Sequence, residues 1–196
     1  SGGEDEPEGT IKYVISGVEV SVVAERVQYY GKDGGLITES LRDYTRNTVR
    51  EHFASVDSFL RRWSEADKKQ AVIEELAEEG VLFDDLKEAV GKDLDPFDLI
   101  CHVVFDQPPL TRRERAENVK KRDVFTKYRD EARAVLNALL KKYADEGVFP
   151  DEMQVLRVHP ISDLGTPLEL VGAFGGKDAY LSAVRELEQA LYATGA

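Results

Sequence analysis

Acidic side chains crowd the middle of this 196-residue chain, where residues 84–98 hold five aspartates. Carboxylates that gather around a divalent metal ion can catalyse phosphodiester hydrolysis. Asp95, however, directly precedes Pro96, and an aspartate followed by proline is typical of a helix start. We therefore expect caps and solvated faces here, and keep as an alternative a metal-dependent hydrolase that uses Asp93, Asp95 and Asp98.

The other residue types suited to metal or nucleophilic chemistry are few and dispersed. His52, His102 and His159 share no ligand spacing, and the single cysteine, Cys101, lies in an apolar run typical of a buried thiol. The glycine-rich segment 172–176 follows a predicted helix rather than a strand, and no G-x-x-x-x-G-K-[ST] phosphate loop occurs. The sequence therefore predicts no catalytic, metal-binding or cofactor-binding residues and no ATP hydrolysis in this chain.

The strongest charge feature is a basic stretch over residues 112–122. Six cations occur in these eleven residues: Arg112, Arg113, Arg115, Lys120, Lys121 and Arg122. Cations at a helix N-terminus oppose the helix dipole, so helix stability does not explain the arginines. Two hypotheses stay open: contact with DNA phosphates or an acidic partner surface, or internal ion pairs with the chain's many acids. Residues 61–63 are a weaker candidate contact, and Trp63 among them is more typical of a core anchor.

The composition is that of a folded protein with an acidic surface. Hydrophobic residues make up 42% of the chain, charged residues 33%, and the formal net charge is -12. The first value supports a sizeable core, and the last disfavours DNA binding over the whole surface. No stretch reaches the roughly 18 apolar residues that a membrane span requires, and no secretory signal is visible. We expect a cytoplasmic protein with no membrane partner.

Residue patterns divide the chain into three segments. Residues 1–9 are polar and rich in helix breakers, which predicts a flexible linker or a remnant of recombinant expression. Residues 10–38 alternate apolar and polar side chains and predict a small antiparallel β meander of two or three strands. Residues 39–196 show helical spacing and predict a helical bundle-like domain that packs with the meander as one unit. The predicted fold class is therefore mainly α.

Local start signals position the predicted helices. Thr38 is expected to cap the first helix, and Asp95-Pro96 opens a helix that is apolar on most sides. Capping-box patterns occur at residues 64–67, 111–114 and 166–169. The second of these boxes places the basic stretch on a helix.

Several segments occur in the order found in one protein family. They are Asp95–Ile100, Pro109–Ala116, Tyr128–Leu136, Leu139–Asp145, Gly165–Pro167, Phe174–Gly176 and Leu191–Tyr192. In this order they resemble the C-terminal domain of the R subunit of type I restriction enzymes, in the EcoEI-like branch. Residues 27–45 are similar to the stretch that follows the second helicase lobe in that family. The likeness covers most of the chain after residue 9, and its specificity lies in the ordered set rather than in any single motif.

The resemblance implies a role in host defence, in which an ATP-dependent multisubunit endonuclease restricts unmethylated foreign DNA. In that family the nuclease domain and translocase lobes lie upstream, so ATP and Mg²⁺ are expected only in those parts of the parent protein. The resemblance also implies a helical region that helps attach the R subunit to the methyltransferase core of modification (M) and specificity (S) subunits, with DNA in the full complex.

We therefore predict a non-catalytic assembly domain of a type I restriction enzyme. The alternative is a module that contacts DNA phosphates through residues 112–122. No catalytic residue carries over from the family, and the assignment of Arg112, Arg113 and Arg115 to docking rests on their charge alone.

Overall fold

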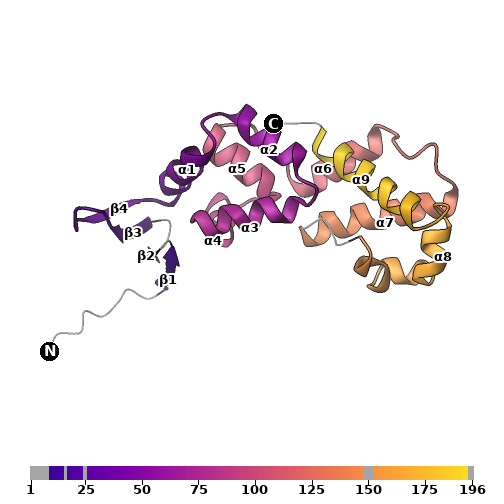
Figure 1. Ribbon diagram of the computed structural model, residues 1–196, viewed down its shortest axis with the longest axis horizontal. Coiled ribbons are helices and arrows are strands. Elements are labelled where there is room, and N and C mark those ends of the chain that lie inside the picture. Colours follow the sequence, from indigo (N-terminus) through magenta and orange to yellow (C-terminus); the bar gives the residue numbers. More distant parts are fainter. Residues whose placement is uncertain (1–8, 16, 24–25, 148–151, 194–196) are drawn as a thin grey trace. The chain divides into compact units, whose positions relative to one another are not determined.

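The computed structural model describes residues 9–15, 17–23, 26–147 and 152–193 (Figure 1). The predicted linker falls, except for its last residue, outside these described residues. The mainly helical fold with a small antiparallel sheet near the N-terminus is confirmed. The chain divides into two compact units. The first consists of the residues up to Lys92 together with Pro96–Pro109. The second consists of Asp93–Asp95 together with the residues from Leu110 onward. Residues 39–196 contribute helices to both units, and their packing with the sheet as one unit stays a prediction.

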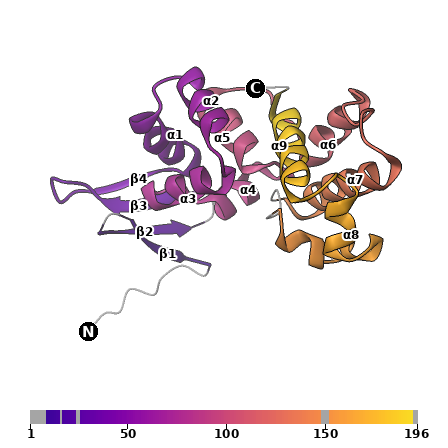
Figure 2. The ribbon, with the colours of Figure 1, turned by 45° about the vertical axis from the view of Figure 1, so that its right-hand side comes forward.

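The first unit opens with a four-stranded antiparallel sheet whose strands pair in chain order (Figure 2). The strands are β1 (Ile11–Ile15), β2 (Val18–Val23), β3 (Arg26–Tyr30) and β4 (Leu36–Ser40). The sequence had predicted two or three strands and a helix cap at Thr38. Thr38 instead pairs with Gln28 in the sheet, and Ser40 caps the first helix by accepting from the Asp43 amide. Threonine and serine are both favourable N-cap residues. The helix begins after Ser40 because Thr38 is still paired within the sheet.

Five helices complete the first unit: α1 (Leu41–His52), α2 (Val56–Glu65), α3 (Lys69–Glu79), α4 (Phe83–Val90) and α5 (Pro96–Phe105). Their core holds an aromatic cluster in which the Trp63 ring lies 5.0 Å from Phe97 and 6.1 Å from Phe59, measured between centroids. Trp63 is 3% exposed, which confirms its interpretation as a core anchor. Most of α5 is buried, as its apolar sequence predicted.

The predicted helix starts are confirmed at two of the three capping boxes. Thr111 and Thr166 each accept a hydrogen bond from the amide three residues later. The box at residues 64–67 is wrong, because Ser64 lies inside α2 and the next helix begins only after Lys68, which makes no side-chain cap.

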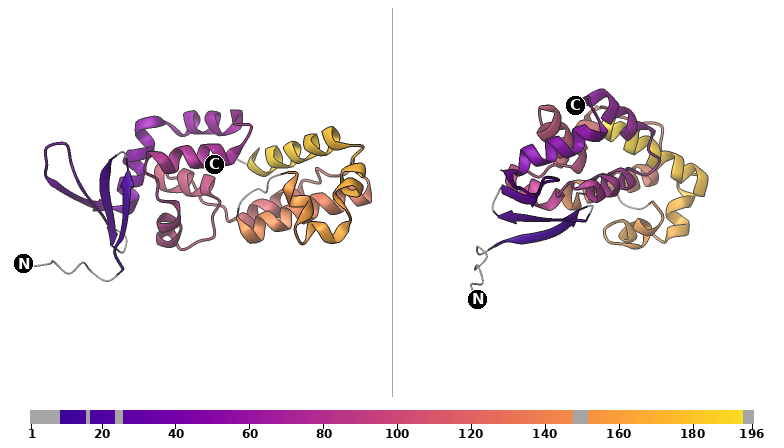
Figure 3. Two further views of the ribbon diagram at one scale, coloured as in Figure 1. Left: turned by 60° about the horizontal axis from the view of Figure 1, so that its bottom comes forward. Right: turned by 60° about the vertical axis from the view of Figure 1, so that its left-hand side comes forward.

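The second unit is built from α6 (Arg112–Lys121), α7 (Asp130–Glu146), the 3-10 turns η1 (Gln154–Arg157) and η2 (Ile161–Leu164), α8 (Pro167–Gly172) and α9 (Lys177–Ala193) (Figure 3). Its core forms around α7 and α9, which bury Leu136, Leu140 and Leu187 completely or nearly so, and α6 packs against both helices. Across both units, none of the helices that the structure describes is long and apolar enough to span a membrane.

Candidate functional site

The basic stretch lies on α6 and just beyond it, and the helix divides its cations between two faces. The helix begins where the Thr111 hydroxyl accepts from the Glu114 amide at 3.1 Å, and the Glu114 carboxylate accepts from the Thr111 amide at 3.2 Å. Residues three and four apart share a helix face, and Arg112 and Arg115 lie on the face that is buried. The other four cations are exposed: Arg113, Lys120, Lys121 and Arg122.

Arg112 uses its charge inside the second unit. The residue is 5% exposed, and its Nη2 lies 2.6 Å from each carboxylate oxygen of Asp93. Its Nη1 donates to the backbone carbonyl of Tyr143 at 3.4 Å, near the end of α7. Gly147 follows that helix at φ +90°, and a Cβ there would overlap the Arg112 guanidinium. Arg112 therefore holds the segment before α5 and the end of α7 together, because a charge-assisted contact of this kind is strong when buried.

Arg115 belongs to a second buried group, which we call the Asp95 network. Arg115 is fully buried, donates to the Leu191 carbonyl at 3.0 Å, and lies 5.5 Å from the Tyr192 ring centroid. Asp95 is 2% exposed and accepts from the hydroxyls of Tyr192 at 2.6 Å and Tyr143 at 2.7 Å. Burial, together with the charge of Asp95, raises the pKa of Tyr192 well above its usual value of 10. The phenol therefore stays protonated and keeps donating to the carboxylate.

The five aspartates of residues 84–98 are divided between the two units, and Asp98 belongs to the first unit rather than to the second with Asp93 and Asp95. Asp85 accepts from the Tyr13 hydroxyl at 2.6 Å and lies in the first unit, whereas Asp93 and Asp95 belong to the second. In the part of the chain that the structure describes, no three His, Cys, Asp or Glu side chains are grouped so as to hold a metal ion.

His52, His102 and Cys101 belong to the first unit, whereas the basic stretch belongs to the second. His52 and His159 each face a carboxylate at the surface, and His102 contacts the carbonyl of Gln107 at 3.1 Å. Cys101 is 2% exposed, which confirms the interpretation as a buried thiol.

The exposed cations differ in how their charge is balanced. Lys120 lies 3.6 Å from the carboxylate of Glu117. Arg122 instead donates to a backbone oxygen, the carbonyl of Ala190 on α9. Among the described residues, no carboxylate lies within ion-pair distance of three of these cations: Arg113, Lys121 and Arg122. Their charge is therefore available to a partner.

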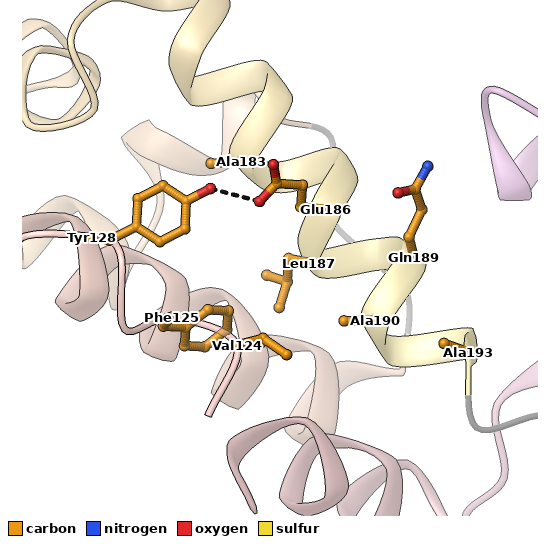
Figure 4. Close-up of a pocket in the computed structure, with 9 residues that line it drawn as sticks. All are labelled: Val124, Phe125, Tyr128, Ala183, Glu186, Leu187, Gln189, Ala190 and Ala193. Atoms are coloured by element: carbon orange, nitrogen blue, oxygen red, sulfur yellow. Dashed lines mark hydrogen bonds between the residues drawn. The ribbon is translucent and has the colours of Figure 1, made fainter. Parts of the chain in front are cut away.

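A pocket of about 320 Å³ opens between α9 and residues 124–128 (Figure 4). We call it the α9 pocket. Val124 and Phe125 form one apolar wall, and Leu187 and Ala190 on α9 form the other. Since the Ala190 carbonyl accepts from Arg122, this cation stands at the border of the pocket.

One side of the α9 pocket carries a small polar group. Glu186 accepts from the Tyr128 hydroxyl at 2.8 Å and from Lys127 Nζ at 2.9 Å. Hydrogen bonds from Lys127 and Tyr128 lower the pKa of Glu186, and the bond to Glu186 raises the pKa of Lys127. Burial, helped by the bond to Glu186, raises the pKa of Tyr128. At neutral pH the group therefore consists of a carboxylate, an ammonium and a neutral phenol.

Sequence reasoning identified the cations of α6 but missed both the Asp95 network and the α9 pocket. One signal was present, because Arg112 and Arg115 share the helical spacing of the apolar residues Ala116 and Val119. A helical face shared with buried apolar residues indicates an inward arginine. The sequence signal for the pocket is weaker: the small residues Ala183 and Ala190 lie seven residues apart on α9.

Comparison with known proteins gives one family and one close relative. The family model described as EcoEI R protein C-terminal matches residues 39–192. The chain is 51% identical over 191 residues to the type I restriction enzyme EcoAI endonuclease subunit of Escherichia coli. The match covers 96% of this chain and 24% of that relative, so the chain spans about a quarter of its length. No solved structure matches the chain.

The family match extends from the last residues of the sheet through all nine helices that the structure describes, ending one residue before the end of α9. It includes both faces of α6, the Asp95 network and eight of the nine residues that line the α9 pocket. The chain therefore belongs to the family of C-terminal domains of type I restriction enzyme R subunits that is typified by the EcoEI R protein.

Proposed function

We propose that this chain is a non-catalytic assembly domain that docks the translocase and nuclease parts of an R subunit onto the methyltransferase core of M and S subunits. In this proposal the parent protein is an ATP-dependent type I restriction endonuclease of the cytoplasm. ATP and Mg²⁺ then act in parts of the parent outside this chain, and DNA is bound in the full complex. The relationship to an endonuclease subunit four times as long supports this division of labour.

The observation that carries the proposal is the surface of the second unit. Asp93, Asp95, Arg112 and Arg115, the side chains best suited to chemistry there, all make contacts inside the unit. On its surface, the second unit has an apolar pocket. Arg122 lies at the border of this pocket, and no described carboxylate balances its charge. Apolar pockets with charged rims are typical of protein interfaces.

The test is gel filtration with light scattering of the chain mixed with the M and S subunits of its own system. We expect co-elution without DNA, at the mass of the methyltransferase plus the bound chain. Co-elution only in the presence of duplex DNA would favour the second candidate below. Free chain in both conditions at micromolar concentration would contradict the assembly role.

The second candidate is a DNA contact through the exposed cations of the basic stretch. Its specific support is that Arg113, Lys120, Lys121 and Arg122 are on the surface. Each phosphate contact makes the slope of log binding constant against log salt concentration more negative by about 0.9. Four cations therefore predict a slope no steeper than about -3.6. Fluorescence anisotropy with a labelled duplex at several salt concentrations measures it. Binding whose affinity does not change with salt concentration would exclude this candidate. Binding that is retained in the double variant Arg113→Glu, Lys121→Glu would exclude it as well.

A further inference from the structure

The α9 pocket is built to hold something apolar. Its walls come from Val124, Phe125, Leu187 and Ala190, and its volume of about 320 Å³ is at the lower end of the usual range for ligand pockets. That space suits one or two apolar side chains rather than a cofactor. Figure 4 shows the walls facing each other across the opening, with Tyr128 and Glu186 at one side and Gln189 at the other.

The segment that leads into one wall of the pocket is basic, although the chain as a whole is acidic. Residues 120–129 hold five cations and one aspartate, in a chain with a formal net charge of -12. Arg122 donates to the carbonyl of Ala190, a pocket residue, and no carboxylate described in the structure balances its charge. Complementary charge therefore calls for a carboxylate on whatever occupies the pocket.

The same features favour a protein occupant over a nucleic acid. Bases bind single-stranded sites by stacking on exposed aromatic rings, but Phe125 is 9% exposed. An apolar side chain with an acidic neighbour satisfies both the walls and Arg122.

We propose that the α9 pocket receives an apolar side chain from an acidic segment of the methyltransferase core, and that a carboxylate of this segment pairs with Arg122. The inference rests on the proposed assembly function and names the surface and the partner chemistry that perform it. Arg122 and the pocket then act together, the first setting the position of the segment and the second burying its anchor.

The experiment measures the dissociation constant between the chain and the purified complex of M and S subunits by biolayer interferometry. Ala190→Phe fills the pocket, and Arg122→Glu reverses the charge at its border. We expect each variant to weaken binding by about tenfold or more, the effect of losing an interface anchor. Glu186→Gln removes the pocket's carboxylate and is expected to strengthen binding of an acidic segment.

Matched controls lie in the same unit away from the pocket. Ala179→Phe puts the same ring on an exposed site of α9, eleven residues and about 16 Å before Ala190. Arg157→Glu makes the same charge change at an exposed arginine of η1. Both controls are expected to bind like the unaltered chain, and thermal melting by circular dichroism checks that every variant is folded.

A labelling experiment leaves the apolar pocket walls unchanged. Its result therefore does not depend on whether the fold tolerates substitutions there. Cys101 is the single cysteine of the chain and is buried, so Gln189→Cys introduces one reactive thiol beside the pocket. A thiol-linked photocrosslinker there is expected to capture a peptide of the M or S subunit that is rich in Asp and Glu.

The outcomes separate this inference from the function on which it rests. If the unaltered chain binds the core but Ala190→Phe and Arg122→Glu bind equally well, the assembly function stands and the pocket proposal is overturned. If the unaltered chain does not bind, both fall. If binding requires duplex DNA and is lost in Arg122→Glu but not in Ala190→Phe, the surface is a phosphate contact.

Discussion

At the scale of single residues, the second unit is held together by polar side chains that are distant in sequence. Asp95 accepts from Tyr143 and Tyr192, which lie 48 and 97 residues later in the chain. A buried carboxylate is tolerated only when hydrogen bonds replace its lost hydration. Each of these hydroxyls therefore stabilises the fold by more than a surface hydrogen bond would.

The first prediction concerns one of these hydroxyls. Tyr192→Phe keeps the ring beside Arg115 but removes the donor to Asp95, and is expected to lower the free energy of unfolding by about 1–3 kcal/mol. Urea denaturation followed by circular dichroism measures the change. Tyr128→Phe is the matched control, since its hydroxyl binds the exposed Glu186, and should cost about 0.5 kcal/mol or less. Equal losses in the two variants would contradict the role given to Asp95.

The second prediction concerns the glycine beside Arg112. Gly147→Ala combines a left-handed backbone at φ +90° with overlap between the new Cβ and the Arg112 guanidinium. Gly91 has φ +70° and open space, so Gly91→Ala carries only the backbone strain, about 1–2 kcal/mol. We expect Gly147→Ala to be the more destabilising of the two in urea denaturation. A smaller loss at Gly147 than at Gly91 would mean that Arg112 does not pack against the end of α7.

At the scale of elements, the sheet is tied to α4 by a hydrogen bond with a predictable pH dependence. The bond to Asp85, with burial, raises the pKa of the Tyr13 hydroxyl to about 12. The folded pKa lies above the unfolded value of 10. The stabilisation is therefore complete below pH 10 and is lost as the pH rises from 10 to about 12.

The third prediction follows from that window. Tyr13→Phe should be less stable than the unaltered chain at pH 9, and the difference should shrink by pH 11.5, because the unaltered protein loses the Tyr13 contribution over this interval. Urea midpoints at the two pH values give the result. Tyr30→Phe, on the exposed end of β3, serves as the control and should follow the unaltered chain. A difference that stays constant across the window would contradict the assignment.

Elements were easier to predict from the sequence than contacts between them. Thr111 and Thr166 were correct starts because a capping box satisfies backbone amides locally. The box at residues 64–67 failed because the preceding helix, anchored by Trp63, continues through Ser64 and Glu65. In the candidate site, periodicity could have assigned Arg112 and Arg115 to the interior. No local pattern could have paired Asp95 with Tyr192, since that contact depends on the tertiary fold.

At the scale of the whole molecule, the chain passes between the two units more than once. Asp93–Asp95 belong to the second unit, while the residues on either side of them, through Lys92 and from Pro96 to Pro109, belong to the first. These three residues supply the partners of Arg112, Tyr143 and Tyr192. The second unit is therefore complete only with a segment that a cut at residue 110 would remove.

The fourth prediction tests this dependence. A fragment that begins at Leu110 leaves Arg112 buried without Asp93, and two buried tyrosines without Asp95. An uncompensated buried charge costs about 3–5 kcal/mol, which is a large part of the roughly 5–15 kcal/mol that stabilises a typical domain. We expect the fragment to lack a cooperative thermal transition by circular dichroism, whereas the whole chain has one. A fragment that melts cooperatively at the temperature of the whole chain would show that Asp93–Asp95 are dispensable.

The position of Asp93–Asp95 also limits how such domains can be exchanged between related enzymes. A chimera joined at residue 110 would set the arginine and tyrosines of one parent against the aspartates of the other, so it inherits stability only where both parents carry compatible pairs. A crossover placed before Asp93 instead transfers the aspartates with their partners, but it carries α5 along and divides the core of the first unit. The surface that we propose for docking is therefore expected to be exchanged more readily by substitutions within α6 and α9 than by transfer of a contiguous block.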